Sequence, residues 1–332
     1  VNGQITLHDN YLQPYGFDFG VENLQGELSF TEDDLLADTL RGELFGNPVS
    51  MDIGTLVAKD NANDTITRVT LAGKVEVNKL EQAFSIKLNP YVAGDFKYQA
   101  LLELHSVAKE SVFKLSSNLQ GLTIDLPQPF SKTTTGASKF DLAYYFGGSK
   151  LPRAIINYNN QINAALASKQ TKPKAIIGEI KFGAEPASIS VDSGLIISGK
   201  IKKLDWSVWR DYLFRAKNSF TKGAGIVWRL NLNIGELHAL GQKLKKVMLQ
   251  ASPKNNGWEI GVSMSTIKGK IFFPKSKDKQ IQGVFQRFYF DIDKKQLTIA
   301  KKNIRKRFLF FSCGRNDREW KNSCIFFITK WW

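Results

Sequence analysis

Three histidines are the side chains of this sequence best suited to proton transfer or metal binding near neutral pH. His8, His105 and His238 are widely separated, and none has a cysteine or second histidine nearby at metal-ligand spacing. The chain also lacks a Gly-x-Ser-x-Gly elbow and a glycine-rich phosphate loop ending in Gly-Lys-Ser/Thr. The sequence therefore gives no positive support for an enzyme, and we expect no catalytic residue, no metal site and no cofactor.

Two acidic pairs carry the oxygen atoms that a cation would need. Asp291 and Asp293 alternate within a strand-like segment, so their side chains share one face, although such pairs are most often simply solvated. Asp33 and Asp34 directly follow Thr31 and Glu32, and this run indicates an acidic turn.

Residues 301–332 differ in composition from the rest of the chain. They hold nine basic and two acidic residues, and thus +7 of the formal net charge of +15, together with both cysteines, Cys313 and Cys324. Such a basic, aromatic segment is either a membrane-surface element or a terminus without selected structure, as an out-of-frame stretch would be. We expect a β-rich domain over residues 1–300, where the remaining +8 is thinly spread, and a tail that contributes nothing to the fold. Because neither part has a recognition-helix or ribonucleoprotein pattern, we expect no nucleic-acid partner.

The elements that would position any site are strands. Apolar and polar residues alternate along several short segments, which is the pattern of a strand with one apolar and one solvated face. The clearest such segments are Val69–Val77, Tyr98–Leu104, Ile226–Ile234 and Trp258–Met264. One-sided strands are typical of antiparallel sheets. No run of about 18 apolar residues is present, so no segment predicts a membrane-spanning helix.

Turn-forming residues separate these segments at short intervals. We expect reversals of the chain at Asn61–Asp64, Phe146–Ser149, Asn159-Asn160 and Pro253–Gly257. A five-residue pattern, aliphatic-x-Gly-Glu/Lys-aliphatic, also recurs irregularly, with its glycine at positions 26, 42, 73, 178, 199 and 269. Glycine on the apolar face of a strand permits a bulge or a bend. The pattern, although common in β proteins generally, predicts a long sheet that curls.

Helices are expected to be few and short, each following a strand. Asp205 is a suitable N-cap for a helix at Trp206–Leu213, and Asn78 for one at Lys79–Leu88. Gly235–Lys245 is a third candidate helix. The predicted fold class is therefore mainly β, a long curled antiparallel sheet with a few short helices.

Several segments resemble the YhdP family of AsmA-like bacterial envelope proteins, which is related to TamB- and AsmA-type lipid-transfer proteins. The most distinctive is Ser117–Phe130, which reads Ser-Asn-Leu-Gln-Gly-Leu-Thr-Ile-Asp-Leu-Pro-Gln-Pro-Phe. The resemblance is one of pattern and order, without a catalytic motif, and it covers roughly residues 20–290. The other segments that carry it are Leu24–Phe30, Leu40–Val49, Ile197–Trp209, Val247–Ala251, Gly257-Trp258 and Gly269–Pro274.

The resemblance implies a periplasmic protein, anchored in the inner membrane by a segment absent from this chain. Such a protein carries phospholipid acyl chains between the inner and outer membranes along the apolar face of a curled sheet, and supports the outer-membrane permeability barrier. On this interpretation the groove is lined by apolar residues of the alternating strands. These are Leu102, Leu104, Trp228, Leu230, Leu232, Val262 and Met264.

Two further functions remain open at this point. One is a structural or assembly module of the cell envelope, in which the same apolar side chains form a closed core without a lipid ligand. The other is a β-rich enzyme acting on envelope glycan or lipid. An open apolar groove along the sheet would favour lipid transport, whereas a compact two-layer sandwich would favour the closed-core module.

Overall fold

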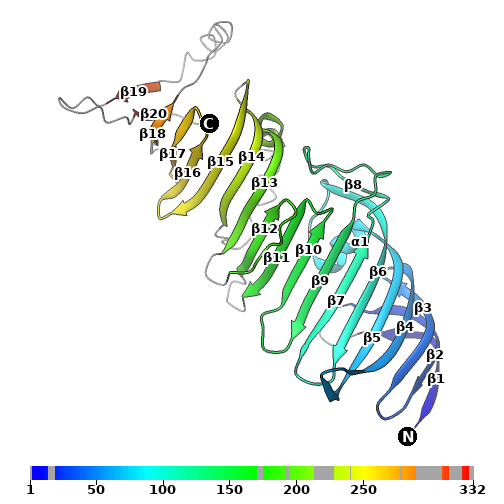
Figure 1. Cartoon of the computed structure of the whole chain (residues 1–332). Coiled ribbons are helices and arrows are strands. Elements are labelled where there is room, and N and C mark those ends of the chain that lie inside the picture. The colour runs from blue at the N-terminus through cyan, green and yellow to red at the C-terminus, as the bar shows by residue number, and fades with distance from the viewer. Residues whose placement is uncertain are drawn as a thin grey trace. The chain divides into compact units, whose positions relative to one another are not determined.

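The computed structural model describes residues 2–13, 19–169, 175–190, 194–212, 228–239, 241–276, 279–288, 309–313 and 324–328. The chain divides into two compact units. Unit 1 comprises Val1–Ile176 and Pro186–Ile189, and unit 2 comprises Ile177–Glu185 and Ser190–Trp332. Each unit is built on a β-sheet (Figure 1), so the prediction of a mainly β fold is confirmed.

The strands of unit 1 form an antiparallel meander, coloured blue to green in Figure 1. β1 to β7 pair in chain order, and β9, β10 and β11 continue the sheet beyond β7. The short β8 pairs instead with the first residues of β6. The bounds are β1 (Gly3–Leu12), β2 (Val21–Phe30), β3 (Leu35–Leu44), β4 (Asn47–Ala58), β5 (Asn61–Glu76), β6 (Val92–His105), β7 (Glu110–Ser117), β8 (Leu122–Ile124), β9 (Phe140–Gly147), β10 (Arg153–Tyr158) and β11 (Ile162–Lys169).

The register of these strands places the apolar residues of the alternating pattern on one face. Met51 of β4 pairs with Leu71 of β5, Leu71 pairs with Ala100 of β6, and Ala100 pairs with Leu115 of β7. Because directly opposite residues in a ladder share a face, this row extends across the sheet. The opposite face is polar, as the Arg68–Glu103 ion pair between β5 and β6 at 2.7 Å illustrates.

The helix α1 (Val77–Phe84) lies against the apolar side of this sheet and contacts β5 and β6. Its residues Val77, Leu80 and Phe84 recur at helical spacing and form its apolar face. The sequence placed this helix at Lys79–Leu88 with Asn78 as its cap, and both details were wrong. The N-cap is Glu76, without a side-chain hydrogen bond, and Ser85 ends the helix in the left-handed conformation with φ 52°.

Two clusters of buried side chains stabilise unit 1. One is centred on Leu24 and Leu40, which are 2% and 0% exposed, and joins β2, β3 and β4. The other joins α1 and the first residues of β6 to Leu119 and Leu122. Each fully buried aliphatic side chain contributes about 1.5–3 kcal/mol relative to an exposed one, so the second cluster fixes the position of α1 on the sheet.

Unit 2 combines parallel and antiparallel pairing. β12, β13 and β14 pair in parallel, and β14 to β18 continue antiparallel. β18 then pairs with β20, and β20 with β19. The bounds are β12 (Ala175–Phe182), β13 (Leu195–Asp205), β14 (Trp228–Ala239), β15 (Gln242–Lys254), β16 (Gly257–Ser263), β17 (Ile267–Pro274), β18 (Ile281–Phe288), β19 (Leu309–Cys313) and β20 (Cys324–Ile328).

The parallel pairs differ from the all-antiparallel sheet that alternation predicts. Parallel neighbours need a crossover of a dozen or more residues, and residues 183–194 and 206–227 provide connections of that length before β13 and β14. Residues 206–212 at the start of the second connection are helical. Their predicted cap is confirmed, because Asp205 Oδ1 accepts hydrogen bonds from the backbone N–H of Ser207 at 2.9 Å and of Val208 at 3.4 Å.

The third predicted helix, at Gly235–Lys245, was wrong. β14 continues to Ala239, and β15 begins at Gln242 after a tight reversal. In this stretch Leu237 pairs with Leu204 on one side and with Leu244 on the other. Pairing with two neighbouring strands therefore outweighs the local helical pattern, and the segment is extended on both sides of the reversal.

Three of the four predicted reversals are confirmed at Phe146–Ser149, Asn159-Asn160 and Pro253–Gly257. The fourth is displaced, because the β4–β5 reversal lies at residues 59–60 and Asn61–Asp64 already belong to β5. The predicted acidic turn is also confirmed, since Thr31 Oγ1 accepts hydrogen bonds from the backbone N–H of Asp33 and Asp34 between β2 and β3. Asp291 and Asp293 lie outside the described residues.

Glycine has the predicted bending role at some positions of the recurring pattern. Gly199 of β13 has φ +112° and lies against the backbone of Phe182, where a side chain would not fit. At Gly269 of β17 the ladder with β18 shifts register, as expected for a β-bulge.

Candidate functional site

The site of interest is a cavity of about 580 Å³ on the apolar face of unit 1. Its lining consists of apolar and aromatic side chains together with Gly20, and includes no charged residue. The lining residues come from α1, from strands between β1 and β10, and from loops between these elements. A cavity of this size and character is within the range of small-molecule and lipid sites in proteins, which is roughly 300–1,000 Å³.

The cavity exists because the sheet of unit 1 curls. Leu12 of β1 and Tyr158 of β10 both line it, although their strands are eight steps apart in the sheet. In a flat sheet, strands spaced roughly 4.8 Å apart would separate these two residues by about 40 Å. The sheet therefore curls, as the glycine pattern predicted, so that strands far apart in the strand order line one cavity.

One wall of the cavity is formed by α1 and the loop after it, which contribute Leu80, Ile86 and Leu88. Glu81 holds this loop in place. Its Oε1 accepts hydrogen bonds from the backbone N–H of Leu88 at 2.6 Å and of Asn89 at 2.7 Å. A carboxylate that binds two consecutive N–H groups fixes the loop more firmly than apolar contacts alone.

A second wall is the segment around β8, which presents Leu119, Leu122 and Ile124 to the cavity. Behind it lies the buried side chain of Lys132, whose ammonium donates to the carbonyl oxygens of Leu122 at 2.7 Å and Thr133 at 3.0 Å. Burial lowers the pKa of Lys132. Lys132 is not a lining residue, and its bonds join the β8 segment to the chain at residues 132–133.

The mouth of the cavity is apolar and exposed. Leu12, Phe84 and Ile86 line the cavity yet are 39%, 48% and 44% exposed. Phe84 also packs against Phe19 and Phe45 with ring centroids 5.4 and 5.8 Å apart, in edge-to-face contacts. Exposed apolar residues that continue into an apolar cavity mark an entrance, because burying them against a ligand is favourable.

The interior of the cavity has no ionised side chain. Tyr98 of β6 is 7% exposed, and its ring lies over Gly73 of β5, its directly paired neighbour. Burial raises the pKa of Tyr98 to about 12, so the phenol stays protonated at any physiological pH. The cavity can therefore stabilise a hydrocarbon group, and it offers an anion no charge to pair with.

Only one of the seven groove residues predicted from sequence lines this cavity. Leu102 of β6 does, and is 5% exposed. Leu104 lies on the same face of β6, two residues further along the strand, but it does not line the cavity. The residues that the prediction missed, such as Tyr98 and Ala100, belong to the same alternating run, so the signal for them was present.

The other five predicted groove residues belong to unit 2. Register places Leu232 of β14, Leu249 of β15 and Val262 of β16 in one row, with Leu230 on the same face of β14. Met264 packs with Val262 beside the buried Phe285. Trp228 begins β14, but its side chain lies outside the described part of the structure. Whether these residues contact lipid stays a prediction.

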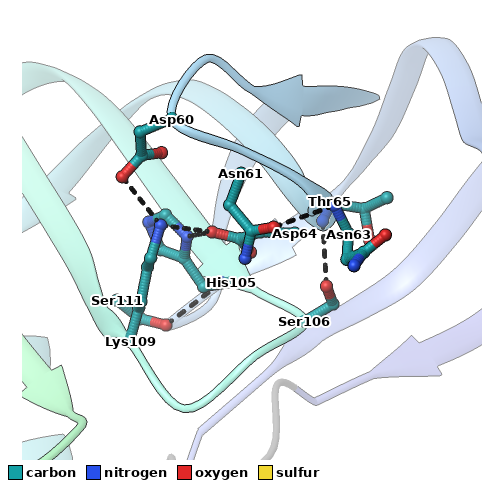
Figure 2. Close-up of polar contacts among 9 residues, drawn as sticks. All are labelled: Asp60, Asn61, Asn63, Asp64, Thr65, His105, Ser106, Lys109 and Ser111. Atoms are coloured by element: carbon teal, nitrogen blue, oxygen red, sulfur yellow. Dashed lines mark hydrogen bonds and ion pairs between the residues drawn. The ribbon is translucent and has the colours of Figure 1, made fainter.

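A second candidate site is a polar cluster at the ends of β5 and β6 (Figure 2). Asp64 is completely buried, and its Oδ2 lies 2.9 Å from His105 Nδ1 and 3.1 Å from Lys109 Nζ. Lys109 Nζ also donates to Asp60 Oδ2 at 2.9 Å. Residues 41 positions apart thus meet, which the isolated position of His105 in the sequence did not indicate.

The charges in this cluster compensate one another. Burial opposes the ionisation of Asp64, but the hydrogen bonds from His105 and Lys109 outweigh it and hold the pKa of Asp64 below its usual value. Hydrogen bonds to Asp60 and Asp64 raise the pKa of Lys109. Ser111 Oγ accepts a hydrogen bond from the backbone N–H of His105. The cluster joins the β4–β5 reversal to the β6–β7 reversal.

Among the residues that the structure describes, no group of three or more His, Cys, Asp or Glu side chains could hold a metal ion. No helix in that part of the chain is long and apolar enough to cross a membrane.

Comparison with known families identifies the chain. The model of the YhdP protein family matches residues 1–317. The chain belongs to the YhdP family. The match extends beyond residues 20–290, where the motifs carried the resemblance, and includes part of the basic tail; the boundary at residue 300 stays a prediction. YhdP membership identifies an AsmA-like bacterial envelope protein, from a family that is not known as enzymatic. No curated protein and no solved structure matches the chain.

Proposed function

We propose that this YhdP-family chain carries phospholipid acyl chains between the inner and outer membranes, and so supports the outer-membrane permeability barrier. The observation that carries the proposal is the cavity of unit 1, which is large, wholly apolar and open at an exposed apolar mouth. Transfer of hydrocarbon from water to such a surface is favourable by about 0.8 kcal/mol for each buried CH₂ group. In this proposal the chain acts in the periplasm, with its attachment to the inner membrane outside the described residues.

A closed-core envelope module is the alternative, and one observation favours it. In the cluster around Leu24 and Leu40, these two side chains are only 2% and 0% exposed and do not line the cavity. The cavity distinguishes the two functions, because a side chain in a closed core contacts only protein, whereas Leu102 in a lipid site contacts an acyl chain.

The test is photo-crosslinking in cells with a diazirine analogue of leucine at position 102, and at position 101 as the matched control. Leu102 lines the cavity. Leu101 is the adjacent residue of β6 and pairs with Thr70 and Lys114 on the opposite face. We expect crosslinked phospholipid from position 102 and none from position 101. Crosslinks to protein alone at position 102 would favour the closed-core module.

A further inference from the structure

Positive charge gathers at one edge of the sheet of unit 2, where β13 and β14 end and β15 begins (Figure 1). Lys203 of β13 pairs with Glu236 of β14, and Glu236 pairs with Lys245 of β15. Their chain neighbours Lys202 and Lys246 lie on either side of β14 at the same level, and both are exposed. The edge therefore presents basic side chains from two strands that flank a third.

The reversal between β16 and β17 extends this edge. Met248, near the start of β15, pairs with Ser263 at the end of β16, and Ser263 pairs with Lys268 of β17. Lys268 is exposed and pairs with Arg287 of β18, whose Nη1 donates to the carbonyl oxygen of Ser265 in the reversal at 2.9 Å. Basic side chains therefore recur along the edge from β13 to β18.

The carboxylates at this edge offset only part of the charge. Glu236 Oε1 lies 3.9 Å from Lys203 Nζ, and Asp211 Oδ1 lies 2.8 Å from Arg210 Nη2. Asp205 caps the helix that follows β13 through two backbone N–H groups. In the described part of the edge, the basic side chains outnumber these three carboxylates, and the excess charge faces solvent. An anionic partner would meet this charge without first displacing a carboxylate of the protein.

The helix that follows β13 adds exposed apolar surface to the same edge. Trp206 is 43% exposed and Val208 is 48% exposed, although tryptophan is highly buried on average in globular proteins. An indole ring has an apolar body and a polar N–H, and it is favoured at the boundary between the headgroups and the hydrocarbon of a bilayer. A soluble polyanion would need only the basic side chains, whereas a bilayer accounts for both features.

We propose that this edge of unit 2 docks on the anionic surface of a lipid bilayer, with Trp206 and Val208 in the interfacial layer and the lysines beside lipid phosphates. Binding of this kind depends on buried apolar area and electrostatic attraction together. Each lysine or arginine near an anionic membrane strengthens binding about fivefold, so several at one edge give measurable binding with only two apolar side chains. The proposal does not depend on a lipid in the cavity of unit 1.

The first test measures cosedimentation of the purified full chain with phosphatidylcholine vesicles that contain or lack phosphatidylglycerol. The variant is Lys202→Glu combined with Lys246→Glu. Its control is Lys275→Glu combined with Lys279→Glu, which makes the same change in charge at the opposite edge of the sheet. There, the backbone N–H of Lys275 donates to the carbonyl oxygen of Asn256, between β15 and β16.

We expect the wild type to bind vesicles that contain phosphatidylglycerol, and to lose this binding at high salt because exposed charges are screened. The variant at the docking edge, Lys202→Glu with Lys246→Glu, should bind at least about 25-fold more weakly, and the control should change binding by less than about fivefold. The basic tail is the same in every protein, so it does not contribute to the difference. Equal effects of the two double variants, or equal binding of wild type to both kinds of vesicle, would overturn the proposal. Circular dichroism checks that each variant is folded.

A second test distinguishes a bilayer from a soluble polyanion. Trp206→Ser should weaken vesicle binding several-fold and leave retention on a sulfated polysaccharide column unchanged, and Trp206→Phe should restore most of the vesicle binding. If Trp206→Ser binds vesicles as tightly as wild type, the helix does not enter the interface. The edge would then recognise anionic polymers through charge alone, and the proposal would be wrong. Crosslinking at Leu102 concerns unit 1, so neither outcome affects the test of the proposed function.

Discussion

Units 1 and 2 share one-sided β-strands, but they differ in charge and in what covers the apolar face. Unit 1 has 16 basic and 19 acidic residues, a net charge of −3, whereas unit 2 has 30 basic and 12 acidic residues, a net charge of +18. In unit 1, α1, its following loop and the β8 segment cover the apolar face around a cavity. Among the described residues of unit 2, the apolar row of β14, β15 and β16 is the corresponding feature.

This comparison shows that alternation alone does not make a site. Both units have apolar faces, but a cavity requires covering elements that are held off the sheet while their own polar groups are satisfied. Glu81 and Lys132 do this in unit 1 through bonds to backbone groups. The charge comparison also corrects the expectation that the +8 of residues 1–300 is thinly spread. It is concentrated in unit 2, which has +11 before residue 301.

The largest effect should come from introducing a carboxylate on each apolar face. Leu102→Asp buries a charge in the cavity of unit 1, and we expect it to lower the free energy of unfolding by about 4 kcal/mol or more. Leu230→Asp in unit 2 is at a half-buried position and should cost about 1 kcal/mol, while impairing lipid transport in cells. Urea denaturation measures the free energy of unfolding of both variants. A photo-crosslinker at Leu230 measures contact with lipid, and one at Asn231 on the other face is its control. Outright unfolding of Leu230→Asp without any lipid crosslink would end the lipid-groove interpretation for β14.

The next effect tests whether the two units unfold separately. Leu40→Ala in unit 1 removes a fully buried side chain and should cost about 2–5 kcal/mol. Val247→Ala is its counterpart in unit 2, also 0% exposed, with an expected cost of about 1–3 kcal/mol. Hydrogen exchange should increase only in the unit that carries the substitution. Equal increases in both units for either variant would mean that they unfold together.

Acid should destabilise unit 1 through Asp64. Because its pKa is held below the usual value in the folded state, ionised Asp64 stabilises the fold above about pH 4, and this contribution is lost as the pH falls through the folded pKa. We expect the stability of Asp64→Asn to depend less on pH in that range. Glu236→Gln is the comparison in unit 2, where a hydrogen bond from His238 lowers the pKa of a more exposed carboxyl. Thermal melts between about pH 3 and pH 6 measure both, and identical profiles for wild type and Asp64→Asn would contradict the assignment.

A smaller effect should come from loosening the cover of the cavity. Glu81→Ala removes the acceptor for the backbone N–H of Leu88 and Asn89 and should cost about 1–2 kcal/mol. Hydrogen exchange should rise at residues 86–92 and not in unit 2. The control is Gln82→Ala, an exposed neighbour on α1. If both variants behave alike, the two hydrogen bonds do not hold the loop.

The smallest effect is expected from removing the tail. Truncation after Ala300 should leave the melting temperature of the chain nearly unchanged, because the composition of residues 301–332 indicates no selected packing. β20 of that segment pairs with β18 in unit 2. A drop of more than about 4 °C, roughly 1 kcal/mol for a domain of this size, would show that this pairing stabilises unit 2.

The sequence by itself determined the strands, most of the reversals and the family. Alternation such as that of Tyr98–Leu104 depends only on the direction of successive side chains along one strand, so it can be read locally. The same is true of the Asp205 cap, which needs only the next three residues, and of the turn at Asn159-Asn160, where both residues adopt φ 52°. The motif around Ser117–Phe130 was enough to indicate the family that the match over residues 1–317 establishes.

Only the tertiary structure decided where the apolar face encloses a space. Leu12 and Tyr158 line one cavity because many small bends add up across the sheet, and no local pattern fixes their sum. Pairing with neighbouring strands made Gly235–Ala239 and Gln242–Lys245 extended, and long connections made β12, β13 and β14 parallel. Asp64 and His105 likewise become partners only through the register of β5 with β6. Local geometry specifies a strand and its faces, but curvature, cover and register are properties of many strands at once.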